Sequence, residues 1–300
     1  MTGARPTWKF RLIAFASRFM MSPTESAGPE KARRELSNST RGPKLLVGER
    51  PALEAITDGQ IAGVAVRRYR PADAGQGTIA FFHGGGWMLG DIEAYDILAG
   101  TLAAETGHEV VSVEYRRSPE HRYPAALDDC IAVTLELLKA GRVAVVGDSA
   151  GGNLAAAVAQ RTKVAAQVLF YPVLDCANER PSYLRYARGH ILTAETIRYF
   201  RREYVPEAYR RHEPGASPLL VTSLDGCPPA YLAVAQCDVL RDEGVAYAER
   251  LSTSGVDVTL DEVPGTLHGF VSLLGLREAR ETLRRASTWL RAKLAEQASV

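Results

Sequence analysis

The sequence lacks an excess of charge of either sign and has few cysteines. Its 300 residues carry a formal net charge of +1, which gives no indication of the strongly basic surface typical of nucleic-acid-binding proteins, and we expect no nucleic-acid partner. No pair of cysteines has the C-x-x-C spacing of a metal site, so we expect free thiols, no bound metal and a reducing, cytoplasmic location. The cysteines are Cys130, Cys176, Cys227 and Cys237.

Long uncharged apolar runs are also missing near the N-terminus. In "WKFRLIAFASRFMM" the longest uncharged stretch, Leu12 to Ser17, is too short for a signal peptide or a membrane span. The spacing of its apolar residues predicts an amphipathic helix. Such a helix could lie on a membrane, but we favour a role in covering the protein's own pocket. We expect no stable membrane insertion, and a monomer or homodimer.

From about Ile56 onward, strand-type and helix-type segments alternate. Apolar strands such as "TIAFF", "RVAVVG" and "AQVLFYPV" are separated by helical segments, and "IAGVAVRRY" also has the composition of one strand. This pattern predicts an α/β fold with a mostly parallel central sheet and helices on both faces. An Arg- and Tyr-rich interruption predicts a helical cap. The expected division is a cap segment at 1–50, core at 51–175, a cap insertion at 176–218 and core again at 219–300.

One short motif predicts a nucleophile. Gly147-Asp148-Ser149-Ala150-Gly151 has the form G-x-S-x-G and lies between a predicted strand and a predicted helix. In that context the serine occupies a sharp turn at a helix N-terminus, which favours developing negative charge. The alternative is a glycine-rich turn in which Ser149 only caps the helix. The strand before it and the helix after it favour catalysis.

A serine needs a base, and in this fold type the acid and the histidine follow the serine along the chain. Of six histidines, His268 in "EVPGTLHGF" has the required order and lies in a loop after a late strand. Asp238 directly follows the strand "PAYLAVAQ" and is the expected acid. Asp242 and Glu243 are competing carboxylates, although their place at the start of a helix accounts for them without catalysis.

The run "HGGGW", residues 83–87, precedes the nucleophile at the position where a second source of oxyanion-binding N–H groups is expected. Side chains there would keep the substrate from the backbone, which accounts for the glycines. The expected donors are Gly85 and Gly86 with Ala150, and Gly84 is an alternative. His83 is expected to fix the loop. Trp87 either lines the substrate pocket or serves packing.

Taken together, the segments "HGGGW", "VSVEYRRSPEHRYPAALDD", "GDSAGGNLA", "FYPVLD", "DVLRDEG" and "HGF" resemble the hormone-sensitive-lipase-like, or GDXG, carboxylesterases of the α/β-hydrolase fold. The resemblance begins at about Thr78 and implies a triad of Ser149, Asp238 and His268. It also implies a cap built from the N-terminal segment and the insertion. Val239 stands where the family usually has proline. Non-catalytic receptors of the same family have lost the triad histidine, whereas this chain has one.

We expect a serine hydrolase that acts on uncharged esters with short to medium acyl chains and needs no cofactor. Amide deacetylation or lactone opening would use the same triad, and the sequence does not separate these reactions. A binding protein for a small acid is a further alternative on the same fold.

Overall fold

The computed structural model describes residues 4–20, 24–40 and 42–296. Its strands form one eight-stranded sheet in the order β1-β2-β4-β3-β5-β6-β7-β8. The strands are β1 Ala55–Ile61, β2 Val64–Arg70, β3 Thr78–Phe82, β4 Glu109–Val113, β5 Val143–Asp148, β6 Ala166–Phe170, β7 Ala230–Ala235 and β8 Val258–Val263.

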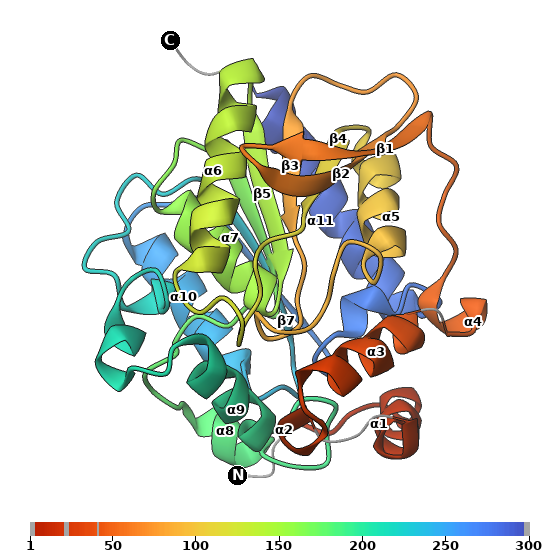
Figure 1. Cartoon of the computed structure of the whole chain (residues 1–300), viewed down its shortest axis with the longest axis vertical. Helices are drawn as coiled ribbons and strands as arrows, with labels where there is room; N and C mark the ends of the chain where they lie inside the picture. Colours follow the sequence, from red (N-terminus) through yellow and green to blue (C-terminus); the bar gives the residue numbers. More distant parts are fainter. Residues whose placement is uncertain (1–3, 21–23, 41, 297–300) are drawn as a thin grey trace.

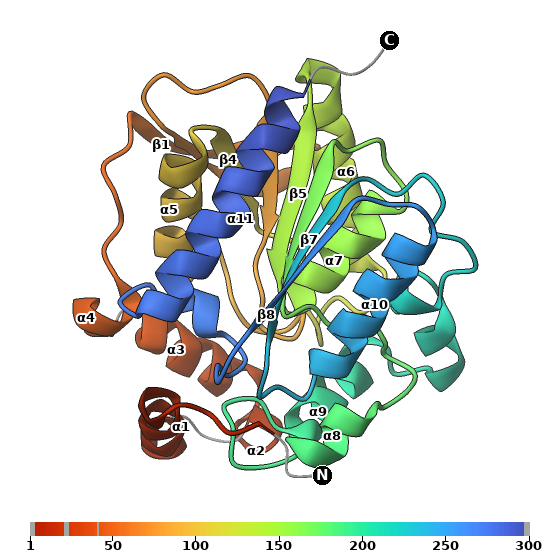
Figure 2. The same ribbon diagram turned by 180° about the vertical axis from the view of Figure 1, so that it is seen from behind.

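The helices cover both faces of this sheet. Figures 1 and 2 show α6 and α7 on one face and α5 and α11 on the other. The helices are α1 Trp8–Met20, α2 Thr24–Ala27, α3 Pro29–Thr40, α4 Lys44–Val47, α5 Asp96–Thr106, α6 Ala125–Ala140, α7 Ala150–Ala159, α8 Pro181–Arg185, α9 Ala194–Tyr204, α10 Arg241–Thr253 and α11 Arg277–Ala295. Short 3-10 turns are η1 Ala208–His212, η2 Pro218–Leu220 and η3 Phe270–Ser272.

The predicted fold class is confirmed. From β4 to β8 the neighbouring strands pair in parallel, and every residue of β5, β6 and β7 is buried. A strand buried on both faces must be apolar throughout, which explains the continuous apolar runs in the sequence. The carboxyl ends of these strands meet at one edge of the sheet, where the loops that carry the candidate site residues leave it.

One expectation about the sheet was wrong. The segment "IAGVAVRRY" is not a single strand, because Ile61 ends β1 and the pair Ala62–Gly63 turns the chain into β2. Both turn residues have positive φ, 52° and 80°, as a tight hairpin requires. The strand β1 was missed because its middle is polar and exposed, and its pairing with β2 is antiparallel.

The segments outside the core series are helical. Residues 176–218 are all described and contain α8, α9 and η1 but no strand. The predicted N-terminal amphipathic helix is present as α1. Within the ranges that the structure describes, no helix is both long enough and apolar enough to cross a membrane.

Candidate active site

Ser149 lies in the turn between β5 and α7, in a backbone conformation that side chains seldom adopt. Its φ is 54° and its ψ is −117°, outside the regions favoured by non-glycine residues. The flanking glycines make this turn sterically feasible. A Cβ at Gly147 would overlap the carbonyl of Gly151, and one at Gly151 would overlap the carbonyl of Phe82. The two glycines of the motif are therefore needed for packing as well as for the turn.

The structure brings Ser149, His268 and Asp238 together in a chain of hydrogen bonds. The Oγ of Ser149 lies 2.9 Å from Nε2 of His268, and Nδ1 of the same imidazole lies 2.6 Å from Oδ2 of Asp238. The serine and the aspartate are 8% and 2% exposed. The other carboxylate oxygen of Asp238 accepts a hydrogen bond from the backbone N–H of Leu240 at 3.1 Å. This contact holds the carboxylate in place beside the imidazole.

The two competing carboxylates are engaged elsewhere. Asp242 accepts a hydrogen bond from the N–H of Ser182 at 2.9 Å. Glu243 accepts one from the N–H of Leu174 at 3.0 Å and faces Arg201 at 3.6 Å. Of the three carboxylates weighed from the sequence, only Asp238 contacts the imidazole.

His83 lies in the core of the glycine loop. It is fully buried and stacks on Tyr115 with ring centroids 4.3 Å apart. Its Nδ1 lies 2.9 Å from the carbonyl oxygen of Gly84, and the hydroxyl of Tyr115 donates to the carbonyl of His83 at 2.7 Å. Burial lowers the pKa of His83, so the neutral imidazole is favoured. These contacts agree with a loop-fixing role.

The three glycines after His83 differ in their neighbours and in their backbone φ angles. A Cβ on Gly84 would lie 2.5 Å from Oδ2 of Asp148. Gly85 has a φ of 110° and Gly86 a φ of 63°, a region that favours glycine. A Cβ on Gly86 would also overlap the ring of Phe200 in α9. A helix from the insertion thus packs directly on the glycine loop, a contact that the sequence did not indicate.

The backbone N–H groups of this loop and of Ala150 are the expected donors to an oxyanion. The carboxyl group of Asp148 lies directly beside Gly84. The N–H groups of Gly85, Gly86 and Ala150 donate to no acceptor among the described residues. The choice of Gly85 and Gly86 as donors to an oxyanion stays a prediction.

Two buried side chains beside the site were not singled out from the sequence. Burial raises the pKa of Asp148 to about 7, and the hydroxyl of Tyr95 donates to its Oδ2 at 3.2 Å. The ring of Tyr171 lies 4.8 Å from the ring of His268, on a residue with a positive φ of 36°. Asp148 belongs to the G-x-S-x-G motif and Tyr171 to the segment "FYPVLD". The sequence of a motif does not show which of its side chains points toward the site, so neither residue was singled out.

Trp87 is fully buried and stacks on Tyr204 of α9, with ring centroids 4.4 Å apart and planes 8° from parallel. Packing accounts for this position, and a contact between Trp87 and substrate stays a prediction. Within the described parts of the chain, no group of three or more His, Cys, Asp or Glu side chains is arranged to hold a metal ion.

Comparison with known proteins shows to which family the chain belongs. Residues 79–272 match the model of a family with the alpha/beta hydrolase fold. The chain belongs to the α/β-hydrolase family. The match begins at the second residue of β3 and includes the glycine loop, the Ser149 turn, Asp238 and His268. It confirms the resemblance found in the motifs.

Individual relatives of this hydrolase are enzymes named for ester hydrolysis. It is 36% identical over 276 residues to Ethyl acetate hydrolase from Pseudomonas putida, covering 84% of this chain and 86% of that protein. It is 34% identical over 290 residues to Carboxylesterase NlhH from Mycobacterium tuberculosis, covering 90% and 91%. The crystal structure of a thermostable esterase from Pseudomonas putida superposes with a TM-score of 0.89 at 32% identity and 99% coverage of both chains. This hydrolase is thus a member of an enzyme family.

Proposed function

We propose that this protein is a serine carboxylesterase that uses Ser149 as nucleophile, His268 as general base and acid, and Asp238 as the residue that orients the imidazole. The observation that carries the proposal is the continuous hydrogen-bond chain, 2.9 Å from the serine to the imidazole and 2.6 Å from the imidazole to the carboxylate. The names of the relatives support an ester as the scissile group.

The mechanism follows from these positions. Nε2 of His268 takes the proton of Ser149 as Oγ attacks the ester carbonyl, and the resulting imidazolium is stabilised by Asp238. The tetrahedral intermediate collapses, and the alcohol leaves with the proton from Nε2. Water then attacks the acyl-enzyme with the same proton transfers and releases the acid. Because Asp238 is buried and already hydrogen-bonded, it can compensate the imidazolium without reorganising.

The oxyanion is bound by backbone N–H groups in this proposal. Ala150 supplies one donor and Gly85 and Gly86 supply the others, since these N–H groups have no acceptor among the described residues. Each well-placed donor lowers the barrier by roughly 3 kcal/mol. The start of α7 adds the favourable field of a helix N-terminus.

The substrates in this proposal are uncharged esters with short to medium acyl chains. The name of the relative that hydrolyses ethyl acetate supports a short acyl group. The packing of Phe200 on Gly86 supports the same limit, because an aromatic ring occupies space directly beside the glycine loop. We also assign residues 1–50 and 176–218 to a cap over the core. Contacts between α2 and α9, including a hydrogen bond from Thr196 to Glu25 at 3.3 Å, support this assignment.

The test is hydrolysis of p-nitrophenyl esters with acyl chains of two to twelve carbons. Ser149→Ala is expected to lose at least about a thousandfold in kcat. The matched control is Ser252→Ala, which changes an exposed serine on α10 and should hydrolyse the esters like the wild type. Equal turnover by Ser149→Ala and the wild type would exclude the proposed nucleophile. Maximal kcat/KM on the longest chains would exclude the proposed substrate range.

A second pair of variants tests the acid. Asp238→Asn should lower kcat by up to about ten-thousandfold, because it favours the wrong imidazole tautomer. Asp242→Asn should have little effect on kcat, since this carboxylate contacts the N–H of Ser182 and not the imidazole. A larger loss of kcat in Asp242→Asn would contradict the assignment.

A further inference from the structure

The helix α1 exposes a row of large apolar side chains. Trp8, Leu12 and Phe15 are 71%, 60% and 56% exposed, and their spacing of four and three residues places them on one face of the helix. The opposite face is buried, with Phe10 at 0% and Ala14 at 5% exposure. The helix is therefore packed against the protein through one apolar face and presents a second one to the outside. We call Trp8, Leu12 and Phe15 the apolar row.

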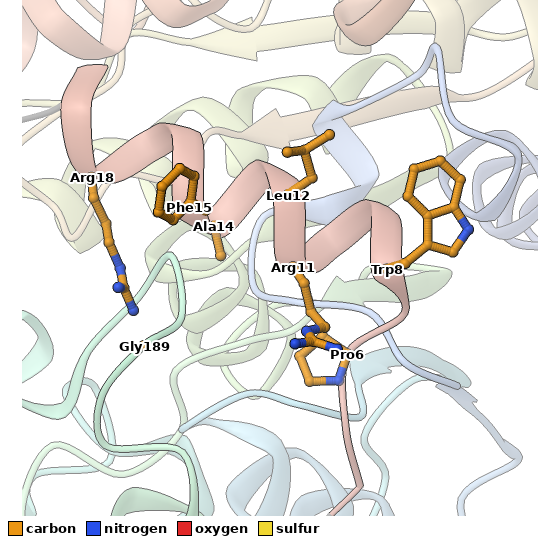
Figure 3. Close-up of a pocket in the computed structure, with 8 residues that line it drawn as sticks. All are labelled: Pro6, Trp8, Arg11, Leu12, Ala14, Phe15, Arg18 and Gly189. Atoms are coloured by element: carbon orange, nitrogen blue, oxygen red, sulfur yellow. The ribbon is translucent and has the colours of Figure 1, made fainter.

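Cationic side chains flank the apolar row. Arg11 and Arg18 lie along one edge and Lys9 lies beyond the other. None of the three forms an ion pair with a carboxylate of the described residues. Figure 3 shows Arg18 extending from the helix toward the loop of Gly189 and Arg11 extending toward Pro6, with Leu12 on the other side of the helix. Between the helix and this loop is a cavity of ≈ 530 Å³.

Other exposed apolar side chains lie at the same end of the molecule. Leu45 of α4 is 87% exposed and Leu184 of α8 is 83% exposed. Both views of the chain place α1, α4 and α8 in the lower part of the molecule (Figures 1 and 2). Five of the eight large apolar side chains that are exposed among the described residues thus lie on these three helices, whereas Leu135, Tyr209 and Leu260 lie on other elements.

This end also carries the loop of His268. The N–H of Thr7, one residue before α1, donates to the carbonyl oxygen of Gly265 at 3.0 Å. A Cβ on Gly265 would lie 2.7 Å from the side chain of Thr7. Gly265 precedes His268 by three residues, so whatever binds α1 is held close to the candidate active site.

We propose that α1 docks this protein reversibly on bilayers that contain anionic phospholipid. The apolar row enters the boundary between headgroups and acyl chains, and Arg11 and Arg18 bind the lipid phosphates. Apolar side chains that include tryptophan, bordered by unpaired cations, have the composition of an interfacial helix. Charge complementarity argues against a second copy of this chain as the occupant, because a twofold contact would bring the same cations of both copies together.

Vesicle flotation of the full-length protein tests the proposal without relying on catalysis. We expect at least tenfold stronger binding to vesicles of phosphatidylcholine with 30% phosphatidylglycerol than to phosphatidylcholine alone. Binding should weaken as salt is raised, because screening shortens the reach of the arginines. Ser149→Ala should bind like the wild type, so failure of the proposed esterase activity would leave this result unaffected.

Three sets of variants locate the docking surface. Replacing Trp8, Leu12 and Phe15 together by serine should lower vesicle binding at least tenfold. Replacing Arg11 and Arg18 by glutamine should remove most of the preference for anionic vesicles, since each basic residue near such a surface contributes roughly fivefold. Leu135→Ser with Leu260→Ser is the matched control. These leucines are 48% and 40% exposed on α6 and β8, away from α1, and their replacement should leave binding unchanged.

Tryptophan fluorescence gives a readout that does not depend on how the triple variant folds. Trp8 is 71% exposed, whereas Trp87 is fully buried, so anionic vesicles should shift the wild-type emission to the blue and Trp8→Phe should remove that shift. Absence of vesicle binding by the wild type, or equal binding by the triple-serine variant, would overturn the proposal. A dimer in sedimentation that dissociates when the apolar row is replaced, without vesicle binding, would assign the surface to a second copy instead.

Discussion

The helices α9 and α1 are both amphipathic and both lie near the candidate site, yet they are attached in different ways. In α9, Phe200 packs on Gly86, Tyr204 stacks on Trp87, and Arg201 is 4% exposed within the protein. In α1, the attachment is made by one buried edge and by the hydrogen bond from Thr7. The difference indicates that α9 is part of the support of the glycine loop, whereas α1 is a surface element beside it.

The buried contacts of Arg201 show most clearly how α9 is attached to the protein. Its Nη2 atom donates to the carbonyl oxygen of Asp175 at 2.5 Å and to the hydroxyl of Tyr183, and its guanidinium lies over the Tyr183 ring. Arg201→Met leaves these buried acceptors without a charged donor, which should lower the free energy of unfolding by about 3 kcal/mol. Urea denaturation at pH 7 measures the loss.

The control for Arg201 is its neighbour on the same helix. The side chain of Arg202 is 50% exposed and meets Glu195 at 3.4 Å. Arg202→Met should change the free energy of unfolding by less than about 0.5 kcal/mol. Similar losses in both variants would show that Arg201 does not anchor α9 in the way the contacts suggest.

The comparison of α9 with α1 also shows which features could be predicted from the sequence and which could not. The Ser149 turn, the triad order and the glycine loop were predictable, because each depends on local sterics or on the direction of parallel strands. The contact between Phe200 and Gly86 was not, since it joins residues more than a hundred positions apart and has no local pattern. The β1–β2 hairpin was missed for a different reason, since a polar exposed strand has no apolar run to reveal it.

Gly86→Ala tests the contact between α9 and the glycine loop. The added methyl group would overlap the Phe200 ring and would sit at a positive φ, so the free energy of unfolding should fall by about 2 kcal/mol. We also expect a lower kcat, because the loop must shift. Adding Phe200→Ala to Gly86→Ala should restore the stability that is lost to the steric overlap, but not the stability that is lost to the unfavourable φ. Thermal unfolding of the wild type, the two single variants and the double variant separates these two causes. Fully additive losses would mean that the ring and the loop do not interact.

The stability of the protein should also depend on pH through Glu243, which faces Arg201 of α9 at 3.6 Å. Burial raises the pKa of Glu243 from an ordinary value of 4.5 to about 8. Between these values the folded protein holds a proton that the unfolded chain has lost, so stability decreases as pH rises. The expected decrease from this group is about 1 kcal/mol between pH 6 and pH 7. Glu243→Gln should flatten the dependence of urea unfolding on pH over this range, and an unchanged slope would contradict the assignment.

The smallest effect is expected on the exposed face of α1. Leu12→Ser removes a side chain that is 60% exposed and should change the free energy of unfolding by less than about 0.5 kcal/mol. Ile197→Ser is the matched change in α9, where the side chain is 1% exposed, and it should cost about 3 kcal/mol or more. A loss above 1 kcal/mol for Leu12→Ser that grows with protein concentration would mean that the apolar row is covered by a second copy. A loss independent of concentration would place Leu12 in the packing of the monomer, and either result would remove the difference between the two helices.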